Sequence, residues 1–197
     1  MKPLPTIGVD RYTFFEITEN EGEVTYSNPT ELKGTVEITP TDQGGADVFD
    51  ADNGAYETIS YIEKLGHEII NADIPPEVDA IWRGLKINKG ALDVGVNTPT
   101  KYFGVAWRIL KSDGSYRYVR YYKGSYSFAS NVGGKTKASA GAPQRQTAKA
   151  AYTAVKEPKR ELYYSYCDDS ELSEEKKNEI AEKWFSDMEY YPIDEDI

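Results

Sequence analysis

The sequence predicts a mainly β fold of the α+β class, flanked by two short helices. Residues Leu32 to Thr39 alternate between apolar and polar faces, which is the period of a half-buried strand. Two apolar-rich segments flank Asp113-Gly114, a dipeptide that favours a tight hairpin turn. Tyrosine accounts for 16 of the 197 residues, and it suits half-buried pleated surfaces and subunit contacts.

Three strands are expected in the first seventy residues. The first runs from Arg11 to Thr18 and is closed by a polar turn at Glu19 to Gly22. The second is the alternating segment Leu32 to Thr39, and the third runs from Thr58 to Ile70.

Between the second and third strands lies a segment, Pro40 to Glu57, with little apolar content. It contains Gly44-Gly45 and Asp52-Asn53-Gly54 and is too long for a hairpin turn. Loops of this length in compact domains are usually functional or disordered. We therefore expect a long projecting loop over about residues 40–57.

A short helix is expected to begin near Ile74-Pro75-Pro76-Glu77. Asp73 is a suitable N-cap, proline fits the first turn, and Glu77 suits the positive end of the helix dipole. Gly84 helps to end the helix. Its expected apolar stripe is Val78, Ile81, Trp82 and Leu85.

The strongest local pattern is a long hairpin over Thr100 to Ser127. If Asp113 and Gly114 form a two-residue type I′ turn, Lys111 faces Tyr116 and Val105 faces Tyr122. The predicted core face then carries Phe103, Val105, Trp107 and Ile109 with Tyr118 and Tyr122. The predicted solvated or interfacial face carries Arg108, Arg117, Tyr121 and Lys123.

The last third combines strands with a helix. A mobile loop is expected over residues 132–146, followed by strands over Thr147 to Val155 and Arg160 to Tyr166. Ser173 is a good N-cap for the second helix. Its apolar stripe should dock on the body or on a neighbour, and it consists of Ile180, Ala181, Trp184, Phe185 and Met188.

Charge divides the chain into a β domain over 1–167 and an acidic helical extension over 168–197. The net charge is −10, and residues 168–197 contribute 12 acidic and 3 basic residues. Such a run is usually a solvated surface, or else a surface that repels a polyanion. Because no basic stripe is present, sequence-specific DNA binding is not expected.

The composition also bears on the compartment. Cys167 is the only cysteine, so no intrachain disulfide can form, which fits a reducing environment. The sequence has no secretory signal and no apolar run long enough for a membrane span. We expect synthesis and assembly in a cytoplasm.

No candidate catalytic, cofactor or metal site is expected, and the chain is predicted not to be an enzyme. His67, the only histidine, is interpreted as an ordinary strand residue, and Cys167 as a plain thiol. A calcium-loop pattern counted from Asp50 fails, because Gly54, Ala55 and Tyr61 occupy its key positions. Phosphate-binding, dinucleotide and nucleophile-elbow motifs are absent from the sequence.

Several stretches, taken in order, resemble the phi13 and TP901-type major tail protein family of long-tailed phages. They extend over roughly Thr6 to Phe128, and more weakly to Tyr166. The acidic end from Asp168 is not part of the common pattern. The matching stretches are Gly8-Val9-Asp10, Leu32-Lys33-Gly34, Ala51 to Gly54 with Tyr56-Glu57, Ala72 to Val78 with Gly84, Lys111 to Gly114 with Tyr116 to Val119, and Tyr122-Lys123-Gly124.

The resemblance implies a β-sandwich or barrel-like structural subunit of the virion tail, assembled in the host bacterial cytoplasm. Such subunits form hexameric rings that stack into a hollow tube around a tape measure protein, between tail tip and terminator proteins. DNA passes through the lumen without specific binding, and no membrane or cofactor takes part.

The resemblance also implies which residues make the subunit contacts. The expected ring-stacking loop comprises Gln43, Asp47, Phe49, Asp50, Asp52, Asn53 and Tyr56. The expected inter-subunit sheet comprises Tyr102, Arg108, Arg117, Tyr121 and Lys123. The alternative hypothesis is a monomeric β-sandwich module that binds a carbohydrate or a receptor through exposed Tyr and Trp.

Overall fold

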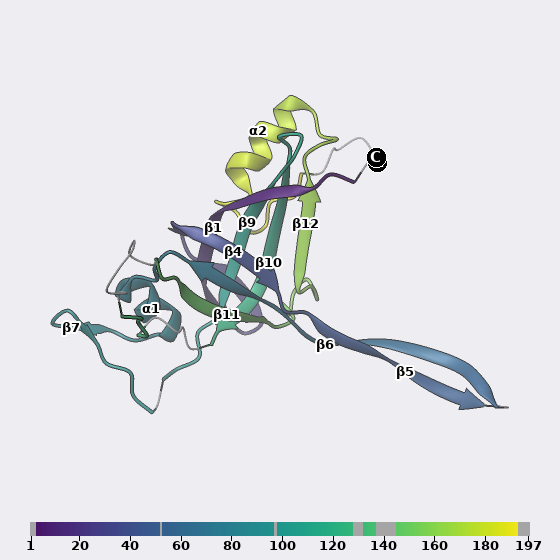
Figure 1. Ribbon diagram of the computed structural model, residues 1–197, viewed down its shortest axis with the longest axis horizontal. Helices are drawn as coiled ribbons and strands as arrows, with labels where there is room; N and C mark the ends of the chain where they lie inside the picture. The colour runs from purple at the N-terminus through teal and green to yellow at the C-terminus, as the bar shows by residue number, and fades with distance from the viewer. Residues whose placement is uncertain (1–2, 52, 97, 128–131, 137–144, 193–197) are drawn as a thin grey trace.

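The computed structural model describes residues 3–51, 53–96, 98–127, 132–136 and 145–192 (Figure 1). Among these residues strands predominate and two helices accompany them, so the prediction of a mainly β, α+β fold is confirmed. Among the described residues, neither helix is long and apolar enough to cross a membrane.

Within these described residues, ten strands form one large sheet. Its main path is β2-β1-β9-β10-β11-β6-β4, while β3 pairs with β1, β5 with β6 and β12 with β10. The strands of this sheet are β1 (Thr6–Asn20), β2 (Glu23–Tyr26), β3 (Thr30–Leu32), β4 (Thr35–Pro40), β5 (Gln43–Ala51), β6 (Gly54–Asn71), β9 (Phe103–Lys111), β10 (Tyr116–Tyr126), β11 (Ala148–Ala154) and β12 (Tyr164–Asp168). A separate two-stranded ribbon consists of β7 (Ile87–Asn88) and β8 (Ala91–Leu92).

The sheet curls around a core, which matches the barrel-like form of the expectation. Strand β4, at one end of the path, also contacts β1 near the other end. Inside the curl lies an aromatic core that includes Tyr12, Phe14, Trp107 and Tyr152. Two stacked sheets are not seen in the described part of the chain.

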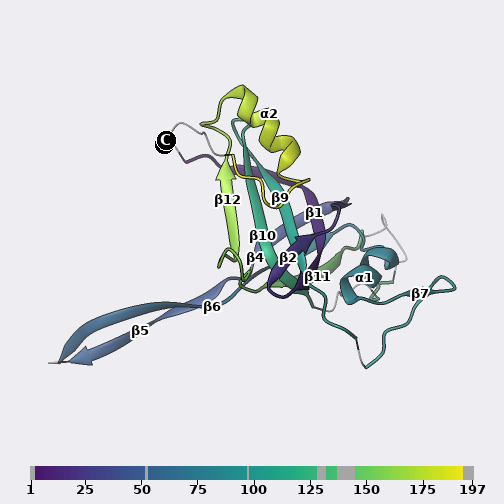
Figure 2. The same ribbon diagram turned by 180° about the vertical axis from the view of Figure 1, so that it is seen from behind.

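Each helix covers a different face of this sheet. Helix α1 (Pro76–Arg83) contributes Trp82 to the core inside the curl. Helix α2 (Glu174–Lys183) and the turn after it cover the other face (Figure 2). There Ile180, Trp184 and Phe185 pack on Tyr118 and other residues of the sheet. The expected docking of this helix on the body is therefore confirmed.

The helix boundaries follow local signals with one exception. Ser173 caps α2, since its hydroxyl accepts the backbone N–H of Lys176 at 3.4 Å. Gly84 ends α1 in the left-handed conformation at φ 63°. The predicted N-cap Asp73 is wrong, because α1 starts at Pro76 and Pro75 occupies the cap without a side-chain hydrogen bond.

The predicted register of the long hairpin is wrong by one residue. Lys111 donates its backbone N–H to the carbonyl of Ser115 at 2.9 Å, and Gly114 has φ 87°. The loop therefore has three residues and a left-handed glycine rather than two residues. Tyr116 faces Leu110 instead of Lys111, and a slip of one residue exchanges the two faces of a strand.

Because of this register, the β10 side chains lie on the opposite faces of the sheet from those predicted. Tyr118 and Tyr122 lie on the α2 side of the sheet, whereas Tyr121 lies in the core and is 4% exposed. The prediction for β9 holds, because Phe103, Val105 and Trp107 all belong to that core, with Ile109 packed against it.

Two further expectations are corrected in detail, and a third stays untested. The segment Leu32 to Thr39 is not one strand, since Gly34 at φ 88° separates β3 from β4. The strand expected from Arg160 begins only at Tyr164 and continues to Asp168. Most of the expected loop 132–146 lies outside the described residues, so its mobility stays a prediction.

Candidate functional site

The segment predicted as a projecting loop is a projecting β-hairpin. Strand β5 and the first part of β6 form a two-stranded ribbon that extends far from the body (Figures 1 and 2). We call residues 43–63 the arm. The loop prediction failed because the segment has few large apolar residues, whereas its backbone pairs from Gln43 with Lys64 to Ala51 with Gly54.

Small residues shape both ends of the arm. At the tip, Asn53 has φ 63°, a conformation that asparagine tolerates better than most residues. At the base, a Cβ on Gly44 would lie 2.6 Å from the carbonyl oxygen of Tyr61. Glycine at this position therefore permits the close approach of β5 to β6.

Both faces of the arm carry exposed apolar side chains. Cross-strand partners share a face, so Val48 lies with Thr58 and Phe49 lies with Glu57 on the opposite face. Of the sixteen exposed large hydrophobic residues among those described, six belong to the arm. They are Val48, Phe49, Tyr56, Ile59, Tyr61 and Ile62, with exposures of 47% to 73%.

The arm is acidic as well as apolar. Its sequence contains five carboxylates and no lysine or arginine. Among the described residues, Phe49 and Tyr56 stack edge to face with ring centroids 6.4 Å apart. An isolated two-stranded ribbon is marginally stable in water, and clustered exposed apolar residues mark interaction sites. The arm therefore has the properties of a docking element.

The predicted ring-stacking residues mostly lie on this arm. Gln43, Asp47, Phe49 and Tyr56 are exposed along it, and Asn53 is at its tip. Asp50 is in β5, and Asp52 lies outside the described residues. The prediction missed Ile59, Tyr61 and Ile62. They lie in the strand expected from Thr58 to Ile70, and they form a surface because no opposing layer of the described chain covers them.

The hairpin of the predicted inter-subunit sheet is central in the sheet of the described chain and offers no free edge there. Its role in subunit contacts stays a prediction. Strand β9 lies between β1 and β10, and β10 pairs with β9, β11 and β12. Tyr121 is buried in the core. Lys123 is 8% exposed, pairs with Glu19 and lies 4.7 Å from the ring centroid of Tyr102.

The two arginines of that prediction are already paired within the chain. Arg108 makes two hydrogen bonds to Asp10, at 2.7 and 2.9 Å. Arg117 makes two to Asp168, also at 2.7 and 2.9 Å. The pKa of the Asp168 carboxyl falls to about 2, chiefly through its hydrogen bond to Arg117. These arginines fasten neighbouring strands to each other.

The edge strand β12 is a second candidate contact surface. Within the described chain it pairs only with β10. Tyr164 and Tyr166 are 37% and 60% exposed, and their rings stack with centroids 6.5 Å apart. Unpaired strand edges readily accept another strand. The sequence could not identify this edge, because the order of strands in the sheet is a tertiary property.

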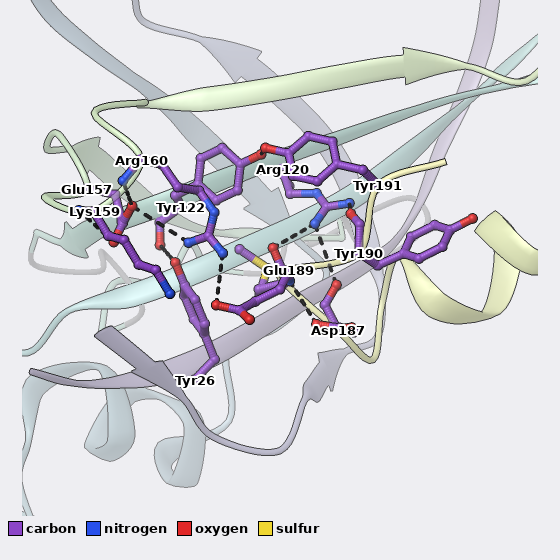
Figure 3. Close-up of polar contacts among 11 residues, drawn as sticks. Tyr26, Arg120, Tyr122, Glu157, Lys159, Arg160, Asp187, Glu189, Tyr190 and Tyr191 are labelled. Carbon is purple, nitrogen blue, oxygen red and sulfur yellow. Dashed lines mark hydrogen bonds and ion pairs between the residues drawn. The ribbon is translucent and has the colours of Figure 1, made fainter. Parts of the chain in front are cut away.

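A buried arginine holds the C-terminal segment on the sheet (Figure 3). Arg120 is fully buried, and its guanidinium lies 3.5 Å from the ring centroid of Trp184. It donates to the backbone carbonyl of Met188 at 2.7 Å and to that of Tyr190 at 2.5 Å. Burial lowers the pKa of Arg120 from its ordinary value.

A second charged pair, Glu157 and Arg160, also contacts the C-terminal segment. Glu157 is fully buried and accepts the backbone N–H groups of Lys159 and Arg160 at 3.2 and 2.7 Å. Arg160 also donates to Glu189 at 2.9 Å (Figure 3). The cluster has the chemistry of a structural fastening, since Arg120 donates to backbone carbonyls and Arg160 to a carboxylate of the same chain.

The remaining candidates for chemistry lie apart from one another. His67 is buried among aromatic rings, and its Nε2 lies 2.8 Å from the hydroxyl of Tyr12. Cys167 is half-buried, and burial raises the pKa of its thiol. In the described part of the chain, no group of three or more His, Cys, Asp or Glu residues could hold a metal ion.

Comparison with known proteins provides no family assignment. Neither the scan against protein-family models nor the search of curated proteins finds a match for this chain.

Proposed function

We propose that this chain is a structural subunit of a phage tail tube, which assembles into rings that stack into a hollow conduit for DNA. The observation that carries the proposal is the arm, an acidic ribbon with apolar side chains exposed on both faces. The expectation that the subunits form rings stacked into a tube comes from the resemblance of the sequence to tail proteins.

The arm favours a polymer over a monomer for a physical reason. A ribbon that projects into water gains stability when a partner covers its apolar faces. A contact between two different surfaces of identical subunits leaves one of each surface free, so it continues into a ring or a filament. The tape measure, terminator and tip proteins are then the partners at the axis and ends of the tube.

The charge of the chain is compatible with a conduit. A basic lumen would hold DNA through its phosphates, whereas a neutral or acidic one lets DNA slide. The net charge is −10. This conduit would assemble in the host bacterial cytoplasm and function in the virion tail.

Electron microscopy of the purified protein tests the proposal directly. The protein is concentrated stepwise, its mass is followed by light scattering, and samples are imaged in negative stain. Rings or hollow tubes are expected. A compact monomer at every concentration, even when seeded with preformed tail tips, would contradict the proposal and favour the carbohydrate- or receptor-binding module.

A shortened arm tests the element that carries the proposal. Gly45 pairs with Tyr61, so replacing residues 46–60 with Asn-Gly would leave a two-residue hairpin at the base. We expect an intact fold by circular dichroism and no tubes. Tubes of normal length from this variant would remove the arm from the assembly contact.

A further inference from the structure

The two ends of the long axis differ in charge. The arm occupies one end and the β7–β8 ribbon with α1 lies at the other (Figure 1). A single strand, β6, joins them, because it starts at the arm tip and ends at Asn71, shortly before α1. Its 18 residues extend over about 60 Å at the usual rise of a strand.

The end opposite the arm carries four exposed basic side chains, which outnumber its exposed carboxylates Asp73, Glu77 and Asp93. Lys86 and Lys89 flank exposed Ile87 on the β7–β8 ribbon. Arg145 lies near the end of β6 that is far from the arm. It comes three residues before Ala148, and Ala148 pairs with Asn71, the last residue of β6. Lys135 is held next to Gln146, the residue after Arg145. The backbone of Lys135 makes hydrogen bonds of 2.8 and 2.9 Å to the side chain of Gln146.

These cations are available to a partner. All four are exposed, and within the described residues none of them makes an ion pair. Apolar side chains accompany them, as they do in the arm. Ile87, Val94 and Val96 are 38%, 50% and 101% exposed. We call Lys86, Ile87, Lys89, Val94 and Val96, with Lys135 and Arg145, the basic end.

From this complementarity we infer that the basic end of one subunit binds the acidic arm of the next. The occupant is a second copy of this chain, because the arm and the basic end lie at opposite ends of one molecule and cannot meet within it. In this contact the exposed apolar residues of the arm cover those of the basic end. Asp47 and Glu57 of the arm approach Lys86 and Lys89 of the other subunit. The inference rests on the proposed function and specifies the partner surface of the arm.

A charge exchange tests this contact. The arm variant Asp47→Lys/Glu57→Lys and the basic-end variant Lys86→Glu/Lys89→Glu each place like charges opposite each other. We expect each variant to raise the critical concentration for assembly about tenfold or more. The variant with all four substitutions restores opposite charges and should assemble within about threefold of the wild type.

A matched control separates this contact from net charge. Glu171→Lys/Glu175→Lys changes the charge by the same amount as the arm variant, and these exposed residues lie beside and within α2, away from both ends (Figure 1). It should assemble within about twofold of the wild type. Circular dichroism and thermal unfolding confirm that every variant is folded.

The possible failures point to different conclusions. If the wild type never assembles, the tail-tube proposal and this contact both fail. If the wild type assembles and the shortened arm does not, but both charge variants assemble normally, only the contact with the basic end is overturned. Loss of assembly in both charge variants without recovery in the combined variant overturns it as well.

Discussion

His67 shows how one buried side chain makes stability depend on pH. Burial lowers the pKa of His67 from 6.5 to about 3, and its imidazole stacks on Tyr152 with ring centroids 4.8 Å apart. Between these pKa values the unfolded chain binds a proton that the folded chain excludes. The contribution of His67 to stability is therefore complete above pH 6.5 and is lost progressively as the pH falls.

The substitution His67→Phe isolates this effect, because it retains a ring and removes the titration. Lowering the pH from 7 to 5 should cost the wild type about 2 kcal/mol more unfolding free energy than the variant. Urea denaturation at both pH values measures the difference. Equal pH dependence in the two proteins would show that His67 does not titrate as its burial requires.

Arg120 fastens the C-terminal segment to the sheet. Its planar guanidinium stacks on Trp184 and reaches two backbone carbonyls, a geometry that a lysine cannot reproduce. Arg120→Lys should lower the unfolding free energy by about 2–4 kcal/mol. It should also increase amide hydrogen exchange in residues 184–191.

The neighbouring Arg117 provides the control for this substitution. It lies on the same strand, its side chain is 39% exposed, and it pairs with Asp168. Arg117→Lys should cost less than about 1 kcal/mol. Similar losses for the two variants would contradict the assignment of Arg120 as the fastening residue.

At the scale of the element, the point where β6 leaves the body constrains its sequence. A Cβ on Gly66 would lie 2.2 Å from the carbonyl oxygen of Tyr152 in β11, whereas one on Gly54 at the arm tip would meet nothing within 4 Å. Gly66→Ala should therefore destabilise the fold by about 2 kcal/mol or more, since backbone must move.

Gly54→Ala should be nearly neutral by comparison. Thermal unfolding of the two variants measures the contrast. A neutral Gly66→Ala would mean that β6 and β11 separate readily at the base of the arm, contrary to their continuous pairing from Leu65 to Asn71.

Sequence patterns predicted element types better than their connections. Ser173 and Gly84 marked helix ends correctly because capping is local. Asp113-Gly114 marked the hairpin correctly but not its register, since Gly114 completes a three-residue loop. Whether the loop has two or three residues depends on the packing of the whole sheet. The three-residue loop places Tyr121 in the core and Tyr118 against α2.

At the scale of the molecule, the described part of the acidic extension, residues 168–192, is part of the folded body. Asp168 belongs to β12 and pairs with Arg117 and Lys111, while α2 covers Phe15 and Tyr118 on the sheet. A charge boundary in the sequence therefore does not mark a gap in the packing. The division at residue 168 reflects a change in amino-acid composition. Strand β12 crosses that position, so the folded structure has no boundary there.

Truncation tests this continuity. A chain that ends at residue 172 should expose the sheet face beneath α2, bind a hydrophobic dye and lose cooperative unfolding. The exposed substitution Glu182→Ala, which leaves the buried face of this segment intact, serves as the control and should unfold like the wild type. A cooperative, dye-free truncated chain would show that residues 173–197 are a dispensable addition.

The length of β6 has a mechanical consequence for a head-to-tail polymer. Tension applied along such a polymer would enter at the arm and leave near α1, so one covalent strand would carry it through each subunit. Its ladders with β4 and β11 would be loaded in shear, and many hydrogen bonds would have to yield together. A tube of such subunits would resist stretching more strongly than bending.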